Sequence, residues 1–125
     1  MHFEFIDAEV AHCHWEDGHM QLRFAAVRLL DDPPQRADAV WGPLLLLAEG
    51  VEPWESLSNV PCMGRLRHGS VLYASQRLQR LPVPSALQGV ITMSLEFAQG
   101  GELHVRCTGL KVQAVHGATV GSYEC

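Results

Sequence analysis

Residues 11–28 read AHCHWEDGHMQLRFAAVR, in which two short alternating runs flank Asp17-Gly18. An Asp-Gly pair favours a two-residue hairpin turn, because both central positions of that turn take positive φ. Pairing outward from the turn gives Glu16 with His19 and then an apolar set on one face: Trp15 with Met20, Cys13 with Leu22 and Ala11 with Phe24. The other face carries polar pairs: His14 with Gln21 and His12 with Arg23. Turn chemistry and apolar pattern agree on one register, so this stretch predicts an antiparallel hairpin.

A second hairpin is predicted from residues 90–107, because residues 90–97 alternate cleanly between apolar and polar side chains. A three-residue loop at Gln99, Gly100 and Gly101 supplies the left-handed glycine with which such loops usually end. This loop pairs apolar residues on the inward face: Phe97 with Leu103, Leu95 with Val105 and Met93 with Cys107. The outward pairs are then Glu96 with His104, Ser94 with Arg106 and Thr92 with Thr108.

The rest of the chain carries shorter strand signals, separated by glycine, proline and aspartate. We expect these extended segments: 3–6 continuing past a bend near Asp7, 44–47 buried on both faces, a hairpin over 63–75 that turns at His68-Gly69, an extended edge over 76–88, and a strand over 111–115. No long stretch has the apolar stripe of an amphipathic helix. The patterns together predict an all-β fold, a small antiparallel β-sandwich or barrel of about seven to nine strands with hairpin connections.

Length and composition indicate one domain. The 125 residues are 47% apolar and 18% charged, which is typical of a globular chain and not of a disordered one. We therefore expect a single β-rich domain over residues 1–125, in which the glycine-rich end 116–125 forms a loose tail.

The cysteines and the N-terminal sequence bear on cellular location. The four cysteines are widely spaced and form no CxxC pair: Cys13, Cys62, Cys107 and Cys125. We expect free thiols in a reducing compartment. The start of the chain lacks the basic and apolar regions of a signal peptide, and its longest aliphatic run, 44–48, is far below the roughly 20 residues of a membrane span. We therefore expect a cytoplasmic protein without a membrane partner, and the use of arginine for eight of nine basic residues favours a GC-rich bacterial source.

Charge is distributed unevenly along the chain. Residues 1–55 carry eleven acidic residues against three arginines, whereas residues 56–125 carry three acidic against six basic residues. The net charge is −5, and no basic stripe is present that would indicate a nucleic-acid partner. An acidic surface attracts a basic protein or the basic half of another copy. The alternative is that the two halves neutralise each other within one fold.

Histidines gather at the first predicted turn. His12 and His14 stand at i and i+2 on a strand and so point the same way, and His19 follows across the turn. Imidazoles in such an arrangement bind zinc or another divalent metal. The predicted register places His12 and His14 outside, beside Arg23, whose charge disfavours a metal, so we predict a solvated face and no cofactor. The alternative is a metal- or small-molecule-binding barrel in which these side chains converge with one further histidine: His19, His68 or His104.

Catalytic motifs are absent from the sequence. The chain has no nucleophile elbow, no phosphate-binding loop and no dinucleotide fingerprint. Glu96 and Glu102 flank the last predicted turn, but we expect them on different faces, so they predict no catalytic acid pair. The sequence therefore favours a role without catalysis.

Aromatic and acidic residues around positions 41–55 are the candidates for partner binding. Trp41 and Trp54 lie at the edges of loops, where an exposed aromatic residue often anchors a partner; the alternative is that they plug an end of the barrel. The acidic residues beside them are Glu49, Glu52 and Glu55. We therefore predict a protein-interaction or self-associating module, of which a bacterial accessory or toxin-neutralising immunity-type protein is one concrete form. A second alternative is a lipid- or ligand-carrying barrel with an empty interior behind Leu22, Phe24, Leu95 and Phe97.

Overall fold

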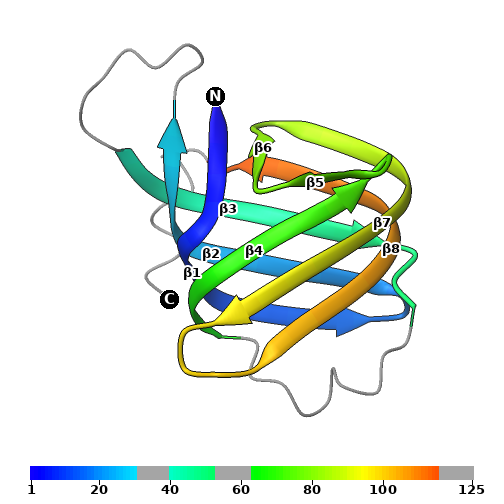
Figure 1. Cartoon of the computed structure of the whole chain (residues 1–125), viewed down its shortest axis with the longest axis horizontal. Helices are drawn as coiled ribbons and strands as arrows, with labels where there is room; N and C mark the ends of the chain where they lie inside the picture. Colours follow the sequence, from blue (N-terminus) through cyan, green and yellow to red (C-terminus); the bar gives the residue numbers. More distant parts are fainter. Residues whose placement is uncertain (31–39, 53–62, 116–125) are drawn as a thin grey trace.

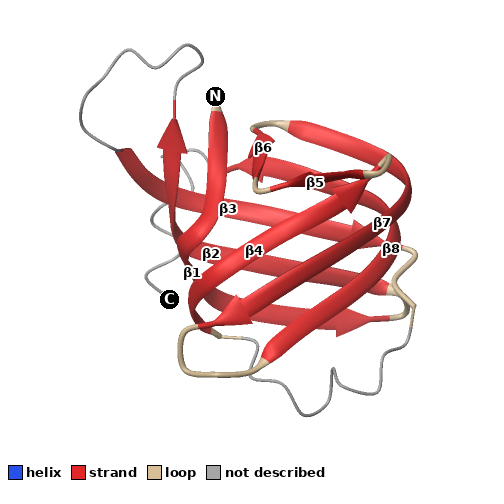
Figure 2. Cartoon of the chain, viewed as in Figure 1, coloured by secondary structure: helices blue, strands red, loops and turns tan. Residues whose placement is uncertain are grey.

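The structure is a computed structural model that describes residues 1–30, 40–52 and 63–115, and all regular elements in these segments are β-strands (Figure 2). The strands are β1 (His2–Glu16), β2 (His19–Leu30), β3 (Val40–Glu49), β4 (Gly64–Tyr73), β5 (Gln76–Leu78), β6 (Arg80–Pro82), β7 (Ser85–Phe97) and β8 (Glu102–Ala114). The predicted all-β class is confirmed. The described segments contain no helix long and apolar enough to span a membrane.

Six of these strands close into a barrel (Figure 1). Neighbours are antiparallel in the order β4-β7-β8-β3-β2-β1, and β1 returns to β4 where Glu9 pairs with Arg65 and Val10 with Gly64. β5 and β6 extend the sheet beside β4 and β1. β1 bends at Asp7, which has a φ of 64°, so its first part pairs with β6 and its second part with β4. The structure therefore selects the barrel of the two predicted architectures and confirms the bend near Asp7.

Large apolar side chains fill the barrel. The largest fully buried residues are Phe3, Phe5, Phe24, Phe97, Met20, Leu22, Leu44, Leu46, Leu66, Leu81, Ile91 and Met93. The Phe3 ring packs edge-on against Phe5 with centroids 4.8 Å apart, and its centroid lies 6.2 Å from that of Phe24. Full burial of one such side chain contributes about 1.5–3 kcal/mol, so this interior is the main source of stability.

The first hairpin has the predicted register from the turn to the pair of His12 with Arg23. Beyond it the prediction is wrong, because β1 bulges at Ala11 and Val10 is the residue that pairs with Phe24. Trp15 shares a face with Cys13 but is 45% exposed, since it lies at the turn end of the hairpin, past the packed interior.

The last hairpin has a three-residue loop, as predicted, but the loop starts one residue earlier. The Phe97 amide donates to the Gly101 carbonyl and the Gly100 amide donates to the Phe97 carbonyl, each at 3.0 Å. Leu95 therefore pairs with Leu103, and every predicted pair is displaced by two residues. Because the displacement is even, each side chain of the predicted pairs keeps its predicted face. Gly100 and Gly101 both have positive φ, 101° and 98°, and Gly100 is the last residue of the observed loop.

The predicted turn at His68-Gly69 is wrong, because β4 runs straight through it. The chain reverses instead at Ala74 and Ser75, which both have positive φ, 51° and 65°. Gly69 serves packing and not a turn: a Cβ there would lie 2.6 Å from Cβ of Phe5.

The remaining predictions concern the third strand and the later part of the chain. The 44–47 run is a strand, but only alternate residues, Leu44 and Leu46, are buried, so burial on both faces is wrong. Residues 76–88 form β5, β6 and the start of β7, in agreement with an extended edge, and residues 111–114 belong to β8. The predicted tail 116–125 lies outside the described residues.

Candidate functional site

A surface hollow of about 410 Å³ lies where β1, β2 and β3 meet. We call it the acidic hollow, and its polar lining is His14, Glu16, Asp17, His19, Gln21 and Glu49. Two cross-strand rows build it: Glu16, His19 and Glu49 in one, and His14, Gln21 and Leu47 in the other. Residues in such rows point to the same side of a sheet, so they share one outward surface.

The acidic hollow has a fixed turn at its edge. The Val51 amide, just after β3, donates to the Gly18 carbonyl at 2.8 Å. This bond ties the Asp17-Gly18 turn to the end of β3. Both strand pairing and this hydrogen bond therefore fix the backbone that carries Glu16, Asp17 and Glu49.

Two ion-pair contacts set the charge balance of the acidic hollow. Nε2 of His14 lies 3.1 Å from Oε2 of Glu16, with both side chains more than half exposed. Nζ of Lys111 lies 3.5 Å from Oε1 of Glu49. Three carboxylates and one lysine thus leave a net negative surface, whose exposed charges are screened by salt.

Several residues predicted from sequence as site residues meet in the acidic hollow: His14, His19 and Glu49. His12 does not line it, although its ring stacks on that of His14, with centroids 6.3 Å apart. Both His12 and His14 are outward and exposed, as the predicted register required. Among the described residues, no group of three or more His, Cys, Asp or Glu side chains has the arrangement of a metal site.

The other predicted partner-binding residues lie apart from the acidic hollow. Trp41 is 49% exposed, which favours the first of its two predicted roles, but it is eight residues from Glu49 along β3, roughly 26 Å at the usual rise of a strand. Glu52 pairs with Arg106 at 3.8 Å. Trp54 and Glu55 are outside the described residues.

Acidic residues of the first part of the chain pair with basic residues of the second part. The pairs across this division are Glu49 with Lys111, Glu52 with Arg106, and Glu4 with Arg80. Internal neutralisation of the two halves, one of the two readings of the charge distribution, therefore accounts for part of the acidic excess.

A second hollow, of about 260 Å³, lies on the outer face of β4, β7 and β8, beside β5. We call it the polar hollow, and its lining includes His68, Ser70, Arg77, Ser94, Glu102 and His104. Of the further histidines that the metal hypothesis named, only His19 lines the same hollow as His14, whereas His68 and His104 line the polar hollow.

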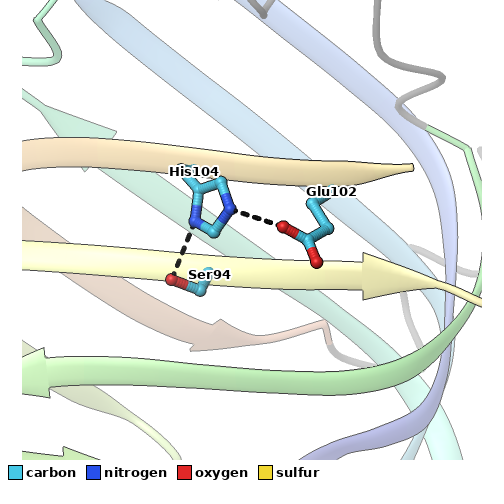
Figure 3. A network of polar contacts seen from close by, with 3 residues as sticks. All are labelled: Ser94, Glu102 and His104. Carbon is cyan, nitrogen blue, oxygen red and sulfur yellow. Dashed lines mark hydrogen bonds and ion pairs between the residues drawn. The ribbon is translucent and has the colours of Figure 1, made fainter.

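Three residues of the polar hollow form a chain of hydrogen bonds (Figure 3). Nδ1 of His104 is 3.1 Å from Oγ of Ser94, and Nε2 of His104 is 2.9 Å from Oε2 of Glu102. The sequence prediction missed this arrangement, because its register placed Ser94 opposite Arg106. In the observed register Ser94 is opposite His104, and Glu96 and Glu102 face each other on one side of the sheet. The expectation of different faces for these two carboxylates is therefore wrong.

Comparisons of this chain with protein-family models, with curated proteins and with solved structures give no match. The geometry defines a small antiparallel six-stranded barrel with two extra strands. The acidic hollow and the polar hollow lie on its outer surface.

Proposed function

We propose that this chain is a protein-interaction module whose acidic hollow receives a basic side chain of a protein partner. The observation that carries the proposal is the convergence of Glu16, Asp17 and Glu49 on one hollow of about 410 Å³. Carboxylates arranged around a concave surface suit the guanidinium of an arginine, which donates several hydrogen bonds in a fixed fork.

The lining of the acidic hollow also suits an alkyl stem. Leu47 of β3 is part of the lining and lies opposite Gln21 of β2. The stems of arginine and lysine pack on such apolar surface while their charged heads stay in polar surroundings. A basic protein, or a second copy of this chain through its basic residues, is therefore the class of partner that fits. A bacterial accessory or immunity-type protein that covers a basic enzyme is one form of this function.

The proposal includes a cytoplasmic location. Cys13 and Cys107 are free thiols, and thiols persist in a reducing compartment.

The two alternative functions from the sequence have less support from the geometry. A carrier barrel needs space behind Leu22, Phe24, Leu95 and Phe97, but these side chains are at most 1% exposed and leave no water-sized room beside them. A metal-binding barrel needs inward convergence of His12 and His14, whose side chains lie on the outward face.

The test is a titration of the isotope-labelled protein with a hexa-arginine peptide, followed by backbone amide shifts. We expect the largest shifts at Gln21, Leu47 and neighbouring amides of the acidic hollow, with affinity that falls as salt rises. The variant Glu16→Gln/Glu49→Gln should weaken binding at least tenfold.

The matched control is Asp7→Asn/Glu9→Gln, which makes the same charge change on exposed acids of β1 outside the hollow. This control should bind as the parent does. Equal weakening by both double variants, or shifts distributed over the whole barrel, would show that the peptide senses only net charge and would overturn the proposal. Sedimentation of the protein at low and high salt tests whether the partner is a second copy.

A further inference from the structure

The hydrogen-bond chain in the polar hollow has the order hydroxyl, imidazole, carboxylate. A nucleophile, a base within hydrogen-bond reach and a third group that orients the base are the parts of an activated serine. The distances of 3.1 Å from Ser94 to His104 and 2.9 Å from His104 to Glu102 meet that requirement (Figure 3).

The carboxylate determines which ring nitrogen of His104 carries the proton. An ionised carboxylate only accepts hydrogen bonds, so the Nε2 beside Glu102 must be the donor. The Nδ1 of neutral His104 is then the acceptor and faces the hydroxyl of Ser94. Glu102 is thus a positioning residue, and the lone pair of Nδ1 is directed at the proton that a nucleophilic serine must lose.

The cationic side chain of Arg77 also lines the polar hollow. Nη1 of Arg77 donates to Oγ of Ser70 at 3.0 Å, and Ser70 is directly opposite Ser94 in the pairing of β4 with β7. Arg77 has further N–H donors that can stabilise negative charge developing next to Ser94.

The placement of the Glu96 and Glu102 carboxylates does not stabilise the pairing of β7 with β8. Glu96 and Glu102 stand directly opposite each other, and like charges in that position destabilise a sheet. Arg67 lies 3.6 Å from Glu96, and His104 contacts Glu102. Arrangements that cost pairing energy tend to mark functional sites, so this one supports a role for the polar hollow.

We propose that the polar hollow is a nucleophilic site in which Ser94 attacks activated ester or phosphonyl groups. This goes beyond the proposed function and uses different residues, so either can fail alone. Oγ of Ser94 attacks the carbonyl carbon and its proton passes to Nδ1 of His104. The bond from that carbon to the leaving oxygen breaks, and the leaving oxygen takes the proton from Nδ1. Water then attacks the acyl-Ser94 ester by the same proton path, which releases a carboxylic acid and restores the serine.

The test uses an alkyl fluorophosphonate, which reacts with activated serine hydroxyls. Oγ of Ser94 attacks phosphorus, the P–F bond breaks, and fluoride leaves with the proton that His104 accepted. We expect one phosphonyl group per chain, located on Ser94 by peptide mass spectrometry, and no labelling in urea. Ser94→Ala should abolish labelling, and His104→Gln should slow it about 100-fold, the usual contribution of a general base.

Two further variants separate catalysis from hairpin stability. Glu102→Gln should slow labelling about tenfold, and Glu102→Asp, which keeps a carboxylate, should restore part of the rate. Thr92→Val removes another outward hydroxyl of β7, outside the network, and should label at the parent rate. Unfolding midpoints of all variants show whether the barrel is intact.

Three outcomes would overturn the proposal: no labelling of the folded protein, labelling on another serine, or a rate that His104→Gln leaves unchanged. Equal labelling rates for unfolded and folded protein would also overturn the proposal, and this comparison needs no variant.

Discussion

Gly69 of β4 lies against the side chain of Phe5 inside the barrel: a Cβ on Gly69 would come within 2.6 Å of Cβ and 2.9 Å of Cγ of Phe5. Phe5 is fully buried and packs against Phe3, so it has no room to withdraw. The absence of a side chain at position 69 therefore allows β4 to pass close to β1.

The first prediction concerns this contact. Gly69→Ala should lower the free energy of unfolding by about 1–3 kcal/mol, the usual cost of overpacking a core. Urea denaturation measures it. Gly42→Ala is the comparison, because its Cβ would meet only the end of the Leu29 side chain at 3.2 Å, and it should cost less. Adding Phe5→Leu to Gly69→Ala should cost less than the two changes summed; strict additivity would argue against the contact.

The second prediction concerns the turn between β4 and β5. Ala74 and Ser75 have φ of 51° and 65°, a conformation that disfavours most side chains and suits Asn-Gly. Ala74→Asn/Ser75→Gly should therefore raise the free energy of unfolding by about 1 kcal/mol. The measurement is the denaturation midpoint at unchanged slope, and a lower midpoint would contradict a turn at this position.

The third prediction concerns Cys107. Burial raises the pKa of the Cys107 thiol from 9.0 to about 11, against the opposing effect of a backbone hydrogen bond with Gly109. The folded protein thus holds the proton more tightly than the unfolded chain, so the stabilisation is complete below pH 9 and is lost as pH rises to 11. We expect a loss of about 2 kcal/mol over that window.

Cys107→Ala supplies the control for this pH dependence. Other groups titrate in the same range, so the quantity to compare is the difference in slope between parent and variant. A parent that loses stability no faster than Cys107→Ala between pH 9 and 11 would rule out a buried neutral thiol.

The fourth prediction concerns Glu4, whose side chain is 13% exposed and lies between Arg28 at 3.4 Å and Arg80 at 3.2 Å. Its carboxylate joins β2 and β6 to β1. Glu4→Gln should cost about 1 kcal/mol, and 1 M salt should shrink the difference because the arginines are largely exposed. Glu9→Gln, the same change at an exposed position of β1, should stay within about 0.5 kcal/mol, and an equal loss there would indicate a general charge effect.

Local chemistry accounts for the parts of the fold that were predictable. Asp17-Gly18 and the alternation around it specify both the turn and the facing pairs, because positive φ and the two-residue period act within a few residues. In the last hairpin the same period predicted the faces, but two adjacent glycines offered two ways to close the loop. The registers differ by two residues and bury the same side chains, so the apolar pattern could not distinguish them.

The candidate sites were likewise predictable from the sequence only in part. The sequence singled out His14, His19 and Glu49, which come from the two strands of one hairpin and from β3. It could not bring them together, because nine residues separate β2 from β3 and no two-residue turn fixes the register of that pair. Glu102 and His104 share a face of β8 in either register, but Ser94 lies opposite His104 only in the displaced register.

By itself, the sequence determined an all-β chain, its first hairpin as far as the pair of His12 with Arg23, and the inward face of its last hairpin, since these follow from backbone preferences and alternation. The tertiary structure decided that the sheet closes, through the pairing of Glu9 and Val10 with Arg65 and Gly64. It also decided that Gly69 is a packing position. Both depend on contacts between residues far apart in the chain, whose geometry is set by the packing of the whole barrel interior and not by any local pattern.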